Sequence, residues 1–223
     1  MTNRLPITLL MGAPGTDGRK IYNRIVNDRE AYHVTAISPW PRSKATQSQD
    51  NLKFVRTTEK LKRLGAGCSC CTVRGDVLSK VRQIFEAGHT DRLMLQVPPQ
   101  SDLEALAKTF SVPDERGDVL GDIAVIDQAV TMIDGRKILQ TLKTRSATLL
   151  TQMVRSSNSV WIDGADTLEP NQLTEVLGAL KVMNPEADLV SGHAGAIKIS
   201  EFAPQAAALD ATAPQAHDIS DPT

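Results

Sequence analysis

The chain has 223 residues, of which 41% are apolar, so it is long enough for one α/β domain with its own core. Aromatic residues make up only 4%, and the core is expected to be mainly aliphatic. The apolar run near the start is too short for a signal peptide or membrane span, and the three clustered cysteines fit a reducing compartment, so we expect a cytoplasmic protein without a membrane partner.

The charge is divided unevenly along the chain, although its net value is only −1. Residues 1–82 carry 15 Lys and Arg against 6 Asp and Glu, whereas the rest carries 10 against 20. A basic half of this kind could attract phosphate or an acidic protein. Because no aromatic interleaving or nucleic-acid-binding motif accompanies it, we interpret most of this charge as solvated helix faces and do not expect nucleic acid as a partner.

The apolar pattern predicts strands that alternate with helices. Ile7–Met11 is a buried strand that stops at a glycine loop, and apolar residues then recur at helical spacing up to Val26. Further strands are predicted at 33–37, 52–55, 93–97, 123–126 and 160–162, and further helices at 57–64, 77–85, 103–110, 138–153 and 173–180. Such alternation indicates a mainly parallel sheet covered on both faces. From about residue 201 the periodicity is lost, so we expect a domain over 1–200 and a disordered tail over 201–223.

All the cysteines of the chain lie within one tetrapeptide, as Cys68, Cys70 and Cys71. Thiolates this close can face one point, and the flanking Gly65 and Gly67 allow the backbone to turn tightly. Sulfur ligands select zinc, copper(I) or related ions, so this loop is the candidate metal site. The alternative is that these are small buried residues at a strand-to-helix junction.

The loop after the first predicted strand has the position of a phosphate-binding loop. The pattern G-x-x-x-x-G-K-[ST] supplies backbone N–H groups, a lysine for the phosphates and a hydroxyl for magnesium. The loop here runs from Gly12 to Lys20, and its candidate nucleotide-binding residues are Gly12, Gly15, Gly18, Arg19 and Lys20.

Two motifs at the right separation resemble those of the CobW-type metallochaperone family of P-loop GTPases. Residues 12–26 align without a gap with that family's phosphate loop, G-F-L-G-[AS]-G-K-T-T-L-L-N-R-I-L. The run Gly67-Cys-Ser-Cys-Cys71 matches its hallmark G-C-x-C-C, and the continuation keeps Thr72, Arg74 and Asp76. The resemblance covers about residues 5–200. It implies a three-layer α/β/α P-loop NTPase-like domain, with the three cysteines binding zinc or a similar ion.

The nucleotide motifs depart from the family at four places. Gly18 and Arg19 replace the phosphate-loop lysine and the magnesium-binding threonine, and Asp17 replaces a glycine. Gln96 stands where the family has an acidic residue, and the segment that begins at Ser38 has lost its carboxylate. The guanine-reading N-K-x-D is Asp163-Gly-Ala-Asp166, which keeps only the last carboxylate, Asp166. Together these changes predict that GTP and magnesium are no longer used for hydrolysis.

The sequence therefore favours a CobW-like metal-binding protein that has lost GTP hydrolysis and acts in metal homeostasis or delivery. Its expected partner is a metal-recipient protein or an active paralogue. One alternative is an unorthodox GTP-binding metallochaperone that uses Arg19 or Lys20 in place of the missing lysine. Another is a non-catalytic interaction module that docks through its basic N-terminal half.

Overall fold

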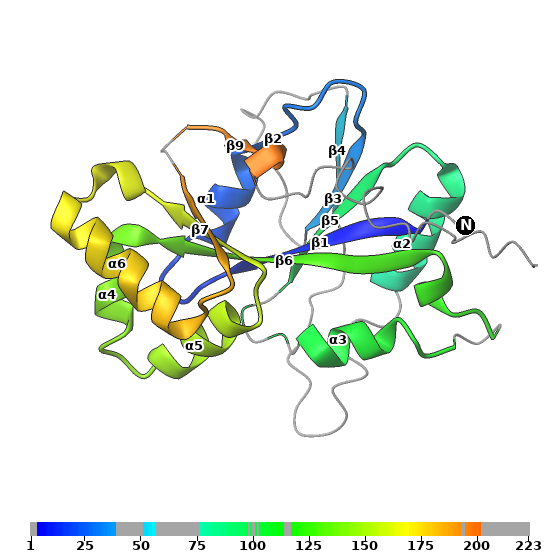
Figure 1. Ribbon diagram of the computed structural model, residues 1–223. Coiled ribbons are helices and arrows are strands. Elements are labelled where there is room, and N and C mark those ends of the chain that lie inside the picture. Colours follow the sequence, from blue (N-terminus) through cyan, green and yellow to red (C-terminus); the bar gives the residue numbers. More distant parts are fainter. Residues whose placement is uncertain are drawn as a thin grey trace, which may run out of the picture.

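A parallel sheet forms the centre of the molecule, as the sequence predicts. The computed structural model describes residues 4–38, 51–56, 76–97, 99, 101, 103–113, 117–192 and 195–201. Within them a seven-stranded sheet runs in the order β4-β3-β5-β1-β6-β7-β8, and every neighbouring pair is parallel (Figure 1). Its strands are β1 (Leu5–Gly12), β3 (Val34–Ser38), β4 (Leu52–Arg56), β5 (Arg92–Val97), β6 (Ala124–Asp134), β7 (Ser159–Asp163) and β8 (Asp188–Ser191).

Helices cover both faces of this sheet, which confirms the α/β/α layering, but they do so unequally. The helices are α1 (Gly18–Asn23), α2 (Asp76–Ala87), α3 (Leu103–Thr109), α4 (Gly135–Thr141), α5 (Ala147–Arg155) and α6 (Pro170–Met183), with short 3-10 turns η2 (Leu120–Asp122), η3 (Ala165–Thr167) and η4 (Ile199–Glu201). Figure 1 shows α3 to α6 on the side of the sheet opposite α1.

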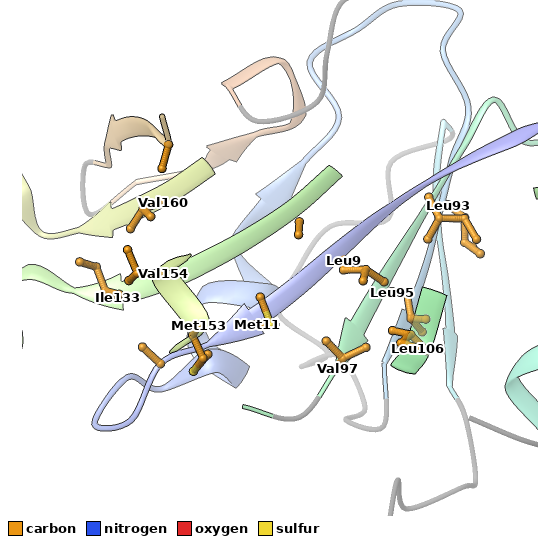
Figure 2. Close-up of a cluster of buried hydrophobic side chains, with 14 of the residues drawn as sticks. Leu9, Met11, Leu93, Leu95, Val97, Leu106, Ile133, Met153, Val154 and Val160 are labelled. Carbon is orange, nitrogen blue, oxygen red and sulfur yellow. The ribbon is translucent and has the colours of Figure 1, made fainter. Parts of the chain in front are cut away.

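Two apolar clusters follow from the alternation of side chains along β1. Leu9 and Met11 point into the larger cluster, which packs β1, β5, β6 and β7 against the helices α2 to α6 (Figure 2). Leu10 points the other way, into a smaller cluster with Ile21 and Tyr22 of α1. Because both faces of the strands are buried, their sequences are nearly continuous apolar runs.

Helix α1 is shorter than the apolar spacing predicts. The predicted helix continued to Val26, but α1 ends at Asn23, and Ile25–Val26 instead form β2, which pairs in parallel with β9 (Ile197–Lys198). β-branched residues suit strands better than helices, and the backbone N–H of Ile197 donates to the carbonyl of Arg24 over 2.9 Å. Asp28 holds the same junction, since its carboxylate accepts from the backbone N–H and the hydroxyl of Ser200.

The prediction of one helix over 138–153 was wrong, because a turn separates α4 from α5. The hydroxyl of Thr144 donates to the carbonyl of Thr141 over 2.7 Å and accepts from the backbone N–H of Ser146 over 3.1 Å. Hydroxyl groups that bond to nearby backbone compete with helical hydrogen bonds, which accounts for the interruption.

Strand β6 is much longer than the four residues predicted for it, because a bulge lets it continue past two polar residues. Ile7 of β1 pairs with Ile126, whereas Thr8 pairs with Gln128, so Asp127 is the extra residue. The carboxylate of Asp127 accepts two hydrogen bonds from the Arg92 guanidinium, over 2.7 and 2.6 Å. Arg92 also donates to the hydroxyl of Thr8 over 2.8 Å, so the buried guanidinium has both a counter-charge and hydrogen-bond acceptors.

Some sequence-based expectations lie outside the described residues. The helix predicted over 57–64, the cysteine loop and the tail from residue 202 belong to that part of the chain. Among the described residues, no helix is both long and apolar enough to cross a bilayer.

Replacing Asp127 with alanine tests the importance of the buried pair. The Arg92 side chain is only 4% exposed, so losing its counter-charge should lower the free energy of unfolding by about 3–5 kcal/mol. Urea denaturation followed by circular dichroism measures this loss. The matched control is Asp118→Ala, which removes an exposed partner of Arg82 and should cost less than about 1 kcal/mol. Equal losses in the two variants would contradict the assignment.

Candidate functional site

The glycine loop lies at the carboxyl ends of the central strands, where parallel α/β sheets bind their ligands. It follows β1 directly, and the backbone N–H of Ala13 donates to the carbonyl of Met132 in β6 over 2.8 Å. The loop closes on itself at its base, because a Cβ on Gly12 would lie 3.2 Å from the Cα of Gly18. The loop is therefore anchored on β6, and its first and last glycines, Gly12 and Gly18, lie close together.

Three of the altered motif positions come together beside this closure. A Cβ on Gly18 would lie 3.7 Å from Nε2 of Gln96, which is buried at the end of β5. The hydroxyl of Ser38, at the end of β3, donates to Oε1 of Gln96 over 2.5 Å. The resemblance assigns a lysine to position 18 and carboxylates to position 96 and to the segment that begins at Ser38. In this structure, position 18 is a glycine, and the uncharged side chains of Gln96 and Ser38 bond to each other.

Asp17 serves the helix that follows the loop. It is the N-cap of α1, and its carboxylate accepts from the backbone N–H of Lys20 over 3.2 Å. The ammonium of Lys20 lies 3.8 Å from the same carboxylate, and both Arg19 and Lys20 are exposed. Asp17 therefore directs its negative charge at the N-terminus of α1, where helix N–H groups favour anions.

Asp134 connects the glycine loop to α4. Its backbone N–H donates to the hydroxyl of Thr16 over 2.9 Å, so the loop hydroxyl is engaged by the end of β6. Its carboxylate caps α4 and accepts from Nε and Nη2 of Arg136 over 2.8 and 3.0 Å. The ammonium of Lys137 lies 3.6 Å from the same carboxylate and 3.4 Å from the carbonyl oxygen of Gly15, to which it donates.

These cations determine the charge state of Asp134. Burial alone would raise the pKa of Asp134, but the hydrogen bonds from Arg136 and the charges of Arg136 and Lys137 outweigh it and hold that pKa below its ordinary value. In return, the hydrogen bond and charge of Asp134 raise the pKa of Arg136. The carboxylate is therefore ionised throughout the neutral range.

The altered guanine loop faces the same helix. Asp163, which occupies the asparagine position, forms an ion pair with Nη2 of Arg24 at 2.8 Å. Gly164 has the left-handed φ of +69°, and a Cβ there would lie 3.3 Å from Nε of Arg136. Asp166 is exposed in η3. The guanidinium of Arg136 thus lies next to the place that the Cβ of a larger residue at position 164 would occupy.

A shallow depression, with no enclosed volume large enough for a water molecule, lies between the loop and α4. Pro14 and Thr16 line one side, and Asp134, Ile138 and Thr141 line the other. Pockets that hold drug-sized ligands have volumes of roughly 300–1,000 Å³, so this depression is not itself a binding pocket for a nucleotide.

The structure describes the predicted nucleotide-binding residues but not the predicted metal ligands. Gly12, Gly15 and Gly18 shape one loop, Arg19 and Lys20 are exposed in the first turn of α1, and Asp166 is exposed in η3. Cys68, Cys70 and Cys71 are outside the described residues. Within the described part of the chain, no group of three or more His, Cys, Asp or Glu is placed to hold a metal ion.

Sequence reasoning missed Asp134, Arg136 and Lys137. The signal was present, because Asp134-Gly-Arg-Lys137 follows a buried strand at the sheet edge where the loop also lies. It was obscured by the early end predicted for β6 at residue 126, which left these residues with no assigned place in the fold.

The lowered pKa of Asp134 predicts a pH-dependent contribution to stability. Asp134→Asn should lower the free energy of unfolding at pH 7 by roughly 1.5–3 kcal/mol, because it weakens charged hydrogen bonds to Arg136. This difference is fully present above the ordinary Asp pKa and should shrink as the pH falls through the lower folded value. Denaturant titrations of both proteins from pH 7 to pH 3 measure it. A difference that grows on acidification would contradict the assignment.

Comparison with known proteins identifies the family of this chain. The family model for the CobW/HypB/UreG nucleotide-binding domain matches residues 8–191. The chain is 24% identical to a zinc-regulated GTPase metalloprotein activator 1 from Dictyostelium discoideum, over 89% of this chain but only 48% of that protein, so it spans about half of that relative's length.

Solved structures show the same fold. The Zn(II)-bound YjiA GTPase from E. coli superposes with a TM-score of 0.62 at 16% identity, over 89% of this chain and 61% of that one. A Zn(II)-bound triple mutant of the same GTPase gives the same values. Because the family model covers most of its length, the chain belongs to the CobW/HypB/UreG nucleotide-binding domain family.

Proposed function

We propose that this protein handles a thiophilic metal ion, zinc or a similar ion, in metal homeostasis or delivery, and that it does not hydrolyse GTP. The proposal rests on two separate parts of the sequence, the cysteine triplet and the altered nucleotide motifs. The cysteine triplet keeps the ligands that soft metals select, whereas the nucleotide site has lost the groups that phosphoryl transfer needs.

The observation that carries the loss of hydrolysis is the grouping of Gly18, Gln96 and Ser38 at one point of the site, with the Ser38 hydroxyl bonded to the Gln96 side chain. Phosphoryl transfer depends on cations that stabilise the charge developing on the phosphate, and these are held by lysine, hydroxyl and carboxylate groups. Here the lysine position is a glycine, and the neutral Gln96 amide is engaged by Ser38. Losing a single stabilising donor typically costs about 10²–10³ in rate, so several losses together favour turnover at background.

The relatives support zinc as the ion to test first. The curated relative is described as a zinc-regulated metalloprotein activator, and the solved relative was crystallised with Zn(II). In this chain Cys68, Cys70 and Cys71 supply three thiolates, one fewer than a closed tetrahedral zinc site requires. The remaining position is open to water, a remote side chain or a partner. Such a site suits transfer of an ion to a recipient protein.

A cytoplasmic carrier of this type acts through a second protein. The partner we propose is a metal-recipient protein or an active paralogue that retains the GTPase motifs. Because Asp17, Gln96 and Ser38 bond within the protein, metal binding here is expected to proceed without control by the nucleotide.

Zinc titration of the reduced protein tests the metal half of the proposal. We expect about one ion per chain, and Cys70→Ser should weaken binding by more than ~100-fold, since even outer-shell changes at metal sites cost 10–100-fold. Competition with a chromophoric chelator gives the affinity. Ser69→Ala in the same loop is the matched control and should leave it unchanged. Unchanged affinity in a triple Cys→Ser variant would sink the proposal.

Rebuilding the phosphate loop tests the nucleotide half. Asp17→Gly, Gly18→Lys and Arg19→Thr together restore the family pattern, and a side chain at position 18 would meet Gly12 only at an ordinary 3.6 Å. We expect magnesium-dependent affinity for GTP to rise, because a repulsive carboxylate is removed and a cation is added. Hydrolysis should stay slow, because Gln96 and Asp163 are unchanged.

Thermal-shift titration with GTP and magnesium measures that gain, and Asp17→Gly alone is the control. Failure of the rebuilt loop to gain affinity would mean that its backbone no longer fits phosphate. Turnover by the unmodified protein that is lost in Arg19→Ala or Lys20→Ala would instead favour the unorthodox GTPase.

A further inference from the structure

The tip of the glycine loop is tied to the segment that begins α4. The ammonium of Lys137 donates to the carbonyl oxygen of Gly15 over 3.4 Å and lies 3.6 Å from the carboxylate of Asp134. The backbone N–H of Asp134 donates to the hydroxyl of Thr16 over 2.9 Å. Two successive residues of the loop, Gly15 and Thr16, are therefore each bonded to this segment.

The packing of the loop agrees with these bonds. A Cβ on Gly15 would lie 3.5 Å from Oγ1 of Thr141, one turn after Lys137. The depression between the loop and α4, lined by Pro14 on one side and Ile138 on the other, has no enclosed volume large enough for a water molecule. The loop therefore packs directly against α4.

The backbone N–H groups of the loop are occupied within the protein. In a phosphate-binding loop such groups surround the anion and donate to it. Here the N–H of Thr16 donates to the carbonyl of Ala13, and the N–H of Gly18 donates to the carbonyl of Thr16, each over 3.0 Å. A phosphate would have to displace these bonds before it could accept from the loop.

One peptide group of the loop is held at both ends. The carbonyl of Gly15 and the N–H of Thr16 belong to the same planar peptide unit, so they turn together. Lys137 holds the carbonyl, and the carbonyl of Ala13 holds the N–H. Turning this N–H toward an anion would therefore turn the carbonyl away from Lys137.

We propose that Lys137 is an autoinhibitory latch, which holds the peptide between Gly15 and Thr16 with its N–H turned inward and so keeps the glycine loop closed to phosphate. Asp134 supports the latch, because its carboxylate lies beside the ammonium and its backbone holds the Thr16 hydroxyl. The inference deepens the proposed loss of nucleotide use and rests on it. It adds a conformational cause to the altered side chains at positions 17, 18 and 19.

Amide hydrogen exchange, measured by NMR on the full chain, tests the latch. Lys137→Met keeps an unbranched side chain but removes the donor. We expect the Thr16 amide to exchange roughly three- to tenfold faster, which is the change that loss of one hydrogen bond typically produces. Lys137→Arg keeps a donor and should retain the slower exchange. Lys143→Met removes an exposed cation from the turn after α4 and should leave Thr16 unchanged.

The amide of Leu142 is the internal reference for the stability of α4. It donates to the carbonyl of Ile138 over 2.9 Å, at the end of the helix, and its exchange should be the same in all these variants. Unchanged exchange at Thr16 in Lys137→Met would overturn the proposal. Equal acceleration at Thr16 and Leu142 would also overturn it, because the helix rather than the latch would then have loosened.

A binding measurement in the rebuilt loop gives a second test, with tripolyphosphate and magnesium as the probe. Adding Lys137→Met to Asp17→Gly, Gly18→Lys and Arg19→Thr should raise the affinity roughly three- to tenfold in calorimetry, because the loop N–H groups become free to turn. Charge alone predicts the opposite, since the lysine is a cation at the loop. No gain, or weaker binding, would overturn the proposal.

The two proposals fail in different measurements. GTP turnover by the unmodified protein would contradict the proposed function, whereas unchanged Thr16 exchange in Lys137→Met would contradict the latch alone. Zinc titration of the same variants should give the affinity of the unmodified protein, because the latch uses no cysteine.

Discussion

The ionised carboxylate of Asp134 is the constraint on which the site depends. It is buried at the end of β6, caps α4 and holds Arg136 and Lys137, while its own backbone N–H holds Thr16 in the glycine loop. Through those two cations it reaches Gly15 on one side and Gly164 on the other. One charged side chain thus connects the phosphate loop, α4 and the guanine loop, and burial makes its pairing obligatory.

This network explains how a nucleotide-type fold keeps its shape after its motifs have changed. Polar groups at the altered motif positions bond within the protein: Asp17 accepts from the backbone of α1, Gln96 accepts from Ser38, and Asp163 forms an ion pair with Arg24. Buried polar groups without partners are costly, so these internal bonds stabilise the site without a ligand. These internal bonds are the physical basis on which we propose metal handling without nucleotide turnover.

The sequence predicted six strands of the main sheet, because strands buried on both faces are nearly unbroken apolar runs. It did not predict the edge strand β8, whose residues are only partly buried. It also placed the glycine loop and the family correctly. It missed the rest of β6 because Asp127 interrupts the apolar pattern, and only the long-range pair with Arg92 explains a charge there. It missed Arg136 for the same reason, since a strand predicted to end at residue 126 left the run 134–137 without a place at the end of a strand. The roles of the cysteines stay predictions.

The central claim is that metal binding here is uncoupled from nucleotide state. The most direct measurement is the zinc affinity of the unmodified protein, by chelator competition, with and without millimolar magnesium–GTP. The account predicts the same affinity in both conditions, because the groups that would sense the terminal phosphate are engaged by the protein itself. Allosteric coupling typically changes affinity by about 5- to 150-fold, and a nucleotide-dependent shift of that size would contradict the account.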